Sequence, residues 1–304
     1  MALDLDNWTA EYLTNELDGR PELAVVTLRQ AIDLYTREKL TAILEETGCQ
    51  RWSEVPLTKE GQLNADRQRE LDFRTGCMQM VIDETDTVLL LMPLEEGGTG
   101  SLFAQAAEAI GAKAVPYGEA FVQKESGGRE EADKILKRIR AEGVTCVVAS
   151  PTHMVALARA AARQAEAGAE EIYLRSILLT GGFAPNKTVM MLEETFQAMI
   201  FEFSDIPEMG IGFASSCGYG QGSHIREADL FIELINTMTE EPIRFESPKT
   251  PGFSNYGEIV LTTLNSEDAP LVRYRTGYYS RWIFGACPCG SQMKRLDKII
   301  PGEE

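Results

Sequence analysis

The spacing of hydrophobic residues changes twice along this chain of 304 residues. Before residue 64, apolar positions recur every three or four residues, most clearly over 23–46, which is the periodicity of one helix face. Between 64 and 208, short continuous apolar runs alternate with amphipathic helical stretches. From about 209, Gly-rich turns and strand-like runs replace the helical spacing. We therefore predict a helical N-terminal segment over 1–63, an α/β core over 64–208 and a mainly β subdomain over 209–300.

The middle region alternates strand-like with helix-like segments, and this alternation builds a parallel sheet covered by helices on both faces. The predicted strands are 87–92, 112–116, 144–149 and 176–180, and the predicted helices are 64–81, 102–110, 130–141 and 153–167. Ser101 is expected to cap the second of these helices, because a serine hydroxyl accepts hydrogen bonds from free N–H groups of a first turn. In the last region, 230–235 and 257–263 are the clearest strands.

The charge of the chain limits its partners. A formal net charge of -18, without clustered Lys and Arg, argues against a nucleic-acid partner. An anionic ligand would have to be held by a local positive site. No apolar run reaches the length of a membrane span, so no membrane partner is expected. The first twenty residues carry five acidic residues and no basic, apolar signal pattern, and the expected location is therefore cytoplasmic.

Three cysteines and a histidine in the last region form the sharpest chemical pattern. Cys217 and His224 stand at the two ends of a glycine-rich segment, while Cys287 and Cys289 lie in a Cys-Pro-Cys-Gly turn. Three thiolates and one imidazole suit a closed tetrahedral zinc site, which leaves no open position for catalysis. The Cys-x-Cys spacing is tighter than the common Cys-x-x-Cys, so the alternative is a set of separate buried thiols and a loop histidine. We favour a structural Zn²⁺.

Three other positions are candidates for ligand binding. The turn 95–101 could hold an anion at a helix N-terminus, although it has no lysine and we favour a plain connection. His153 follows Ser-Pro-Thr where a strand meets a helix, the edge at which ligands gather in such sheets; it either lines a pocket or lies at the surface. Glu208 follows a proline in a turn, where a carboxylate could hold Mg²⁺.

The last third of the chain resembles the phenylacetate–CoA ligases. The segments 256–264 (YGEIVLTTL), 269–277 (APLVRYRTG) and 287–290 (CPCG) are similar to three successive motifs of that family, GELVFTTL, LPLIRYRTGD and CPCG. Shorter similar segments upstream extend the resemblance to about residues 50–300. It implies the large N-terminal domain of an acyl-adenylate-forming ligase, which is an α/β fold with a parallel sheet, flanking helices and a smaller mainly β subdomain.

The resemblance also implies roles for individual residues. Glu208 falls on the Mg²⁺-binding glutamate of the family, and His153 and Gly210 fall at its substrate-binding site. Cys217 and His224 fall where several members carry a cysteine and a histidine. The positions assigned to the nucleotide are Gly181, Gly182, Ala184 and Pro185, in the turn that helps to hold the adenine, together with Glu208 and Tyr278.

Three departures from the family pattern concern ATP. The Ser/Thr/Gly-rich phosphate loop should follow a segment like 57–63, but here the helical stretch 64–74 follows directly. The aspartate that grips the ribose in the family is Tyr278, a neutral phenol. The chain stops near residue 300, before the small C-terminal domain that carries the family's catalytic lysine, so that domain is expected to be absent. Loss of a single stabilising donor lowers an enzymatic rate by about 10²–10³-fold.

Three functional hypotheses follow. The first is a diverged ligase-like protein that binds a small carboxylate, an acyl-CoA or a partner protein without efficient adenylation; ATP, Mg²⁺ and CoA are then not expected as cofactors. The second is an AMP-forming carboxylate–CoA ligase with altered nucleotide use, or one completed by a separate subunit. The third is a scaffold that forms homodimers through its first sixty residues.

Overall fold

The structure is a computed structural model that describes residues 65–94, 98–117, 128–206, 210–243, 245, 256–264, 271 and 273–302. The predicted helical segment 1–63, residues 95–97 of the turn 95–101, and Glu208 therefore lie outside the described residues. The described residues fall into two compact units. The α/β unit runs to His224 and includes Ala286–Gln292, and the β unit comprises the described parts of Ile225–Gly285 and Met293–Glu304. The α/β unit thus extends past the boundary expected near residue 209.

A mostly parallel sheet forms the centre of the α/β unit. Its strands lie in the order β7-β6-β5-β4-β3-β1-β2. Neighbours from β5 to β2 are parallel, whereas β6 runs antiparallel to β5. The strand bounds are β1 Thr87–Leu91, β2 Lys113–Pro116, β3 Cys146–Ala149, β4 Ser176–Leu179, β5 Met199–Ile206, β6 Ile211–Ser216 and β7 Ser223–Ile225.

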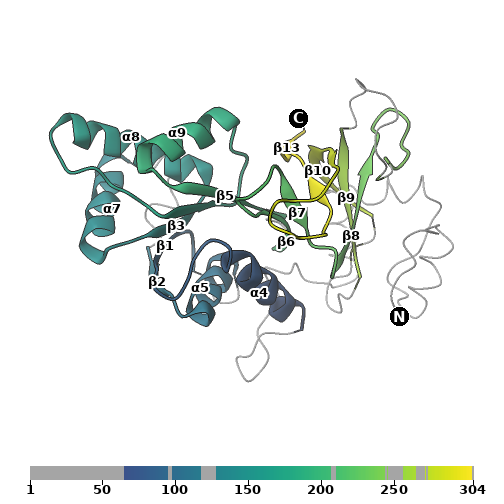
Figure 1. Cartoon of the computed structure of the whole chain (residues 1–304), viewed down its shortest axis with the longest axis horizontal. Helices are drawn as coiled ribbons and strands as arrows, with labels where there is room; N and C mark the ends of the chain where they lie inside the picture. Colours follow the sequence, from purple (N-terminus) through teal and green to yellow (C-terminus); the bar gives the residue numbers. More distant parts are fainter. Residues whose placement is uncertain are drawn as a thin grey trace. The chain divides into compact units, whose positions relative to one another are not determined.

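Helices cover both faces of this sheet (Figure 1). The helix bounds are α4 Ala65–Met78 and α5 Thr99–Ile110 on one face, and α7 Arg129–Glu142, α8 Pro151–Glu166 and α9 Asn186–Phe196 on the other. Every residue of β3 is buried, and successive side chains of the strand pack into the cores on opposite faces. Cys146 and Val148 pack toward α4 and α5, while Val147 and Ala149 pack toward the other three helices. Burial on both faces explains the continuous apolar runs in the sequence.

The predicted fold class is confirmed, as are four strands and four helices of the core, to within a few residues. The predicted cap of the second helix is wrong. Helix α5 begins at Thr99 with Gly98 as its N-cap, so Ser101 lies inside the first turn, where its hydroxyl accepts a hydrogen bond from the Gln105 side chain at 3.1 Å. The pattern did not predict α9, because only Leu192 and Phe196 of this helix are buried and their apolar stripe is short.

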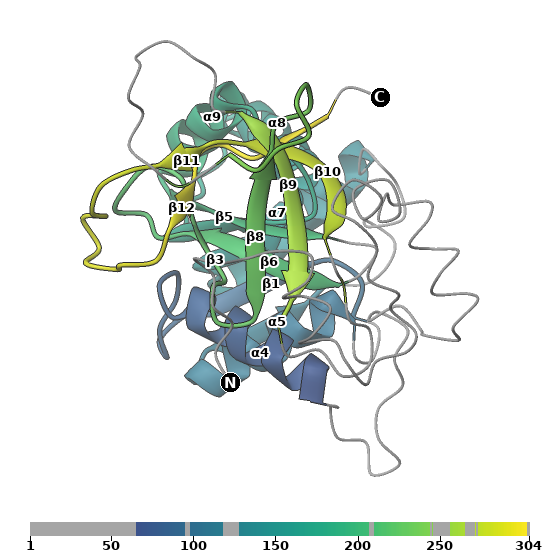
Figure 2. The same ribbon diagram turned by 90° about the vertical axis from the view of Figure 1, so that its right-hand side faces the viewer.

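The β unit contains an antiparallel sheet in the order β13-β10-β9-β8, of which Figure 2 labels β8, β9 and β10. The strand bounds are β8 Leu230–Ile235, β9 Gly257–Thr263, β10 Tyr274–Ser280 and β13 Ile300–Pro301. Two short strands, β11 Trp282–Ile283 and β12 Arg295–Leu296, pair antiparallel with each other and continue the order of the larger sheet beyond β7. The strands predicted at 230–235 and 257–263 are confirmed. A buried ion pair stabilises this unit, since both the Nε and the Nη2 of Arg273 bind the Glu233 carboxylate, at 3.0 and 2.9 Å.

Among the helices of the described residues, none is both long enough and apolar enough to cross a membrane.

Candidate metal centre and ligand-binding turn

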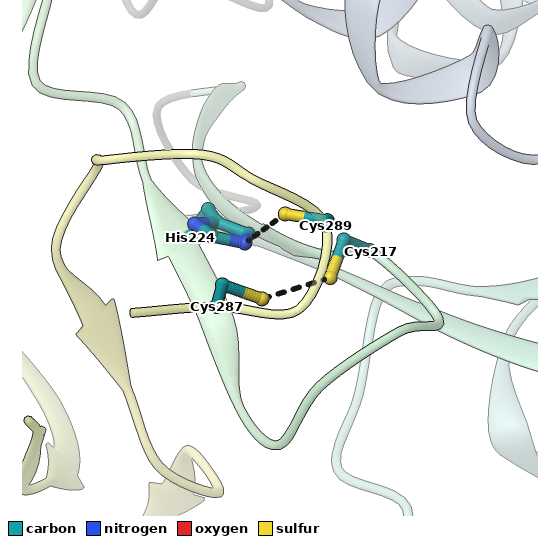
Figure 3. Close-up of side chains that lie close together, drawn as sticks. All are labelled: Cys217, His224, Cys287 and Cys289. Atoms are coloured by element: carbon teal, nitrogen blue, oxygen red, sulfur yellow. Dashed lines mark hydrogen bonds between the residues drawn. The ribbon is translucent and has the colours of Figure 1, made fainter. Parts of the chain in front are cut away.

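The four side chains predicted to bind zinc converge within the α/β unit. Cys217 directly follows β6 and His224 lies in β7, while Cys287 and Cys289 come from the turn within Ala286–Gln292. Figure 3 shows the four side chains pointing toward one another from these two segments. Their ligand atoms all lie within 4.8 Å of one another. The alternative of separate, unrelated thiols does not describe this arrangement.

The distances suit a tetrahedral ion. Zinc bonds of about 2.3 Å to sulfur and about 2.0–2.1 Å to nitrogen would separate two sulfur ligands by about 3.8 Å, and a sulfur from a nitrogen by about 3.5 Å. The Sγ atoms of Cys217 and Cys287 are 3.6 Å apart, and Cys289 Sγ lies 3.3 Å from His224 Nε2. These two distances agree with the zinc geometry to within a few tenths of an ångström, and the other pairs, all within 4.8 Å, need to approach by no more than about 1 Å.

The backbone around the sulfur atoms is arranged to donate hydrogen bonds to them. Burial raises the pKa of the Cys217 thiol, while backbone N–H groups of Tyr219 and Gly220 donate to its sulfur and oppose that rise. The backbone N–H of Ser291 points at Cys289 Sγ from 3.5 Å. Such donors stabilise thiolates, which are the form that binds a metal.

The loop between Cys217 and His224 requires glycine at its start. Gly218 has a φ of 73°, and a Cβ at this position would lie 2.8 Å from the ring of Phe201. Both the backbone conformation and the close approach exclude other residues without strain. The glycine therefore lets the chain turn sharply and bring Cys217 and His224 to the same centre.

The predicted adenine turn lies between β4 and α9. Gly181 has a φ of 69° and is exposed together with Gly182, whereas Ala184 is buried. Asp205 of β5 accepts a hydrogen bond from the backbone N–H of Gly181. Burial raises the pKa of Asp205 to about 6. The sequence analysis missed Asp205, because β5 also carries the carboxylate of Glu202 and nothing in the sequence distinguishes the two.

A buried charge cluster, defined here as Glu70, Arg74 and Asp205, lies beneath this turn. Glu70 and Arg74 of α4 form an ion pair in which both side chains are fully buried. The Glu70 carboxylate also accepts the backbone N–H of Gly212 at 3.0 Å. Gly210, a predicted substrate-binding residue, has its carbonyl oxygen 3.4 Å from Arg74 Nη2. The cluster thus fixes the residues that follow Glu208 against α4.

Aromatic rings surround the cation of this cluster. The guanidinium carbon of Arg74 lies 5.3 Å from the ring centre of Phe103 and 5.1 Å from that of Phe203. Contact with two ring faces partly replaces the hydration that a buried guanidinium loses. The sequence analysis missed this pair, because a charged i,i+4 pair on a helix is typical of an exposed face.

His153 is buried and occupies the third position of α8. Its backbone N–H donates to the capping Ser150 hydroxyl at 3.3 Å, and its Nδ1 lies 2.9 Å from the same oxygen. Burial lowers the pKa of His153, so the imidazole is neutral at pH 7. The histidine is therefore part of the helix start and does not lie at the surface; its substrate-binding role stays a prediction.

Tyr278 belongs to the β unit. It lies in β10 opposite Pro301 of β13 and is half-buried. Its backbone N–H donates to the Thr276 hydroxyl at 3.0 Å, and that hydroxyl donates to the carbonyl of Ile259 at 2.8 Å. The backbone at Tyr278 is thus well ordered by its neighbours, and its role at a nucleotide stays a prediction.

No family model matches the chain. A phenylacetate-coenzyme A ligase of Thermus thermophilus is 29% identical over 199 residues, which are 64% of this chain and 40% of that protein. A phenylacetate-coenzyme A ligase of Escherichia coli is 26% identical over 211 residues, which are 67% of this chain and 42% of that protein. The similarity therefore spans less than half the length of either relative.

Solved structures of 2-hydroxyisobutyryl-CoA ligase share the fold. The postadenylation state in complex with R3-HIB-AMP has a TM-score of 0.66 at 16% identity and covers 88% of this chain and 57% of that chain. An open conformation in complex with 2-HIB-AMP and CoA has a TM-score of 0.61 at 17% identity, over 79% of this chain and 50% of that chain. The chain is thus similar in sequence to phenylacetate–CoA ligases and shares the fold of a solved CoA ligase, and these two likenesses support a place in the adenylate-forming ligase family.

Proposed function

We propose that this chain is a diverged adenylate-forming ligase relative that binds a small carboxylate or its CoA thioester without efficient adenylation. The observation that carries the proposal is the phenol of Tyr278 at the position of the ribose-binding aspartate in the family motif. The direct succession of 57–63 and 64–74, with no Ser/Thr/Gly-rich loop between them, supports it. The relatives carry coenzyme A ligase in their names, which supports small carboxylates and acyl-CoA as the ligand class.

The energetic reason lies in the chemistry of the two side chains. An ionised carboxylate accepts hydrogen bonds from two adjacent ribose hydroxyls, whereas a neutral phenol presents a single oxygen on a rigid ring. Hydrogen bonds to a charged group contribute about 1.5–3 kcal/mol each. Loss of two of them would weaken nucleotide binding by about two to four orders of magnitude.

Calorimetry on the chain tests this proposal. ATP–Mg²⁺, a panel of aryl and short-chain carboxylates, and their CoA thioesters are titrated into wild type and into Tyr278→Asp and Tyr278→Phe variants. We expect binding of a carboxylate or thioester, no micromolar binding of ATP–Mg²⁺ by wild type or Tyr278→Phe, and a gain of nucleotide affinity in Tyr278→Asp. Micromolar binding of ATP–Mg²⁺ to the wild type would contradict the proposal.

A second candidate is an AMP-forming carboxylate–CoA ligase with altered nucleotide use. The retained Thr276-Gly277 of the family motif and Glu208 at the position of its Mg²⁺ ligand favour it. In this reading a separate subunit, or a second copy of the chain, completes the site. Pyrophosphate release is measured with the same acids, for the chain alone and together with proteins encoded nearby. Release above background in either assay would favour this candidate over the first.

We further propose that Cys217, His224, Cys287 and Cys289 hold a structural Zn²⁺. The closed set of four ligands and the N–H donors around the sulfur atoms support this assignment. Bound zinc would cross-link Ala286–Gln292 to the β6–β7 loop and would take no part in chemistry. Elemental analysis is expected to find one zinc per chain in wild type and in the control Cys146→Ser, and much less in Cys217→Ser. An equal zinc content in all three proteins would contradict the assignment.

A further inference from the structure

The four residues of the proposed metal centre differ in their exposure to solvent. Cys217, His224 and Cys287 are 1%, 6% and 5% exposed, whereas Cys289 is only partly buried. We therefore expect a small solute to reach the centre most readily at Cys289. Oxidation of cysteine follows exposure and thiolate character together, and a metal ligand carries the thiolate form.

We propose that Cys289 is the oxidant-sensitive ligand of the centre and that its reaction with a hydroperoxide releases the metal through a disulfide between Cys289 and Cys217. This inference rests on the metal centre proposed above. It makes the centre a reversible redox switch that controls how Ala286–Gln292 is held on the α/β unit.

The reaction has two steps. First, the Cys289 thiolate attacks one oxygen of the hydroperoxide, so that an S–O bond forms and the O–O bond breaks. The leaving oxygen takes up a proton; when the hydroperoxide is hydrogen peroxide, the product released is water. Second, the Cys217 thiolate attacks the resulting sulfenic acid at sulfur; an S–S bond forms, the S–O bond breaks, and the hydroxide that leaves is protonated to a second water. Two electrons pass from the two sulfur atoms to the peroxide.

Cys217 is the favoured partner because it comes from the opposite segment. Its sulfur lies within 4.8 Å of the Cys289 sulfur, and the two thiols interact directly. Cys287 is only two residues from Cys289 in the same turn, so a disulfide between them would close a small strained ring. After the reaction only Cys287 and His224 remain as ligands, which is too few for a closed zinc site.

The chain offers an internal control. Cys146 is fully buried in β3, and burial raises the pKa of its thiol to about 12, so it stays protonated and unreactive at pH 7. Cys77 of α4 is also buried. Peroxide consumption and disulfide formation are therefore expected at the metal centre before either of these thiols reacts.

The experiment uses the zinc-loaded chain without reductant. Hydrogen peroxide is added in increments, released zinc is followed with a chromogenic chelator, and disulfides are located by peptide mass spectrometry. We expect zinc release in proportion to a Cys217–Cys289 disulfide, and recovery after dithiothreitol and zinc are added. Cys289→Ser, checked first for its zinc content, is expected to release zinc at least about tenfold more slowly, whereas Cys146→Ser behaves as wild type.

The outcomes separate this inference from the assignment of the metal. A chain that contains no zinc before oxidation refutes the metal centre itself. A zinc-loaded chain that keeps its metal in excess peroxide, or that forms its first disulfide at Cys77 or Cys146, refutes the redox switch alone. If Cys289→Ser fails to bind zinc, the order of labelling of the wild-type cysteines by a small alkylating reagent during peroxide treatment decides the case. The inference then requires that Cys289 be the first cysteine that the alkylating reagent no longer labels.

Discussion

Replacement of Glu70 by glutamine tests whether the buried charge cluster stabilises the α/β unit. The variant keeps a side-chain oxygen that can still accept the backbone N–H of Gly212, but it leaves the fully buried guanidinium of Arg74 without its closest anion. Breaking a buried ion pair by removing one partner costs about 3–5 kcal/mol. We expect a value at the lower end of that range, because Asp205 lies close enough to act on Arg74 and because two aromatic rings also contact the guanidinium.

Two further variants make the reasoning quantitative. Glu70→Ala also removes the acceptor of the Gly212 N–H and leaves a cavity, so it should cost about 1–3 kcal/mol more than the glutamine variant. The double variant Glu70→Leu, Arg74→Met replaces both charges by apolar groups of similar size, and it should be more stable than Glu70→Gln. Asp72→Asn, at an exposed position of the same helix, is the matched control and should change stability by less than about 0.5 kcal/mol.

Urea denaturation followed by circular dichroism measures these differences as changes in the free energy of unfolding. The reasoning depends on the charge of Arg74 being uncompensated when Glu70 is neutral. If Glu70→Gln unfolds at the same urea concentration as wild type, or if the double variant is the least stable of the set, the cluster does not stabilise the fold in this way.

Three other predictions address the turn and the metal loop. The pKa of Asp205 is about 6 in the folded protein and 3.8 in the unfolded chain, so the unfolded chain loses its proton first and wild type loses stability as the pH rises from about 4 to 6. The Asp205→Asn variant should lack this loss. The difference between its urea midpoint and that of wild type should therefore be larger at pH 7 than at pH 4. The Gly218→Ala variant should lose about 1 kcal/mol or more of stability and zinc affinity beyond what Gly143→Ala loses. Both glycines have a positive φ, but only at Gly218 would the added Cβ lie 2.8 Å from an aromatic ring. Equal effects of the two variants in denaturation and zinc titration would show that the clash with the ring does not matter. Removal of zinc by a chelator should expose the Ala286–Gln292 segment to limited proteolysis, with protection restored by added zinc, and cleavage that is independent of zinc would argue against a structural ion.

The sequence predicted the fold well where burial leaves a pattern. The strands of the sheet are buried on both faces and stand out as continuous apolar runs, and α7 has a clear stripe of Ile135, Leu136 and Ile139. Helix α9 was missed because only Leu192 and Phe196 of this helix are buried. The wrong cap at Ser101 has a local reason: a serine in a Gly-rich turn resembles an N-cap, but the helix starts two residues earlier, at Thr99.

The candidate site was predictable to the extent that residue type alone defines the chemistry. Cys217, His224, Cys287 and Cys289 could be grouped from sequence because thiols and imidazoles have few other reasons to recur in Gly-rich turns. The partnership of Glu70 and Arg74 with Asp205 could not, because it depends on α4 packing beside β5 and β6, more than 130 residues later in the chain. A charged residue gives no sign in the sequence of whether tertiary packing will bury it.

The two polar centres of the α/β unit lie at opposite ends of one strand. At the start of β6, Gly212 is bound to Glu70, and directly after the end of β6 comes Cys217. The charge cluster is built into the core between α4 and the sheet, whereas the metal ligands join a loop to a short turn at one end of the strand. Zinc removal should therefore free the turn and leave the sheet folded, while neutralisation of Glu70 should lower the stability of the whole unit. A chelated protein that loses the cooperative unfolding transition of its sheet would show that the metal stabilises more of the fold than its four ligands indicate.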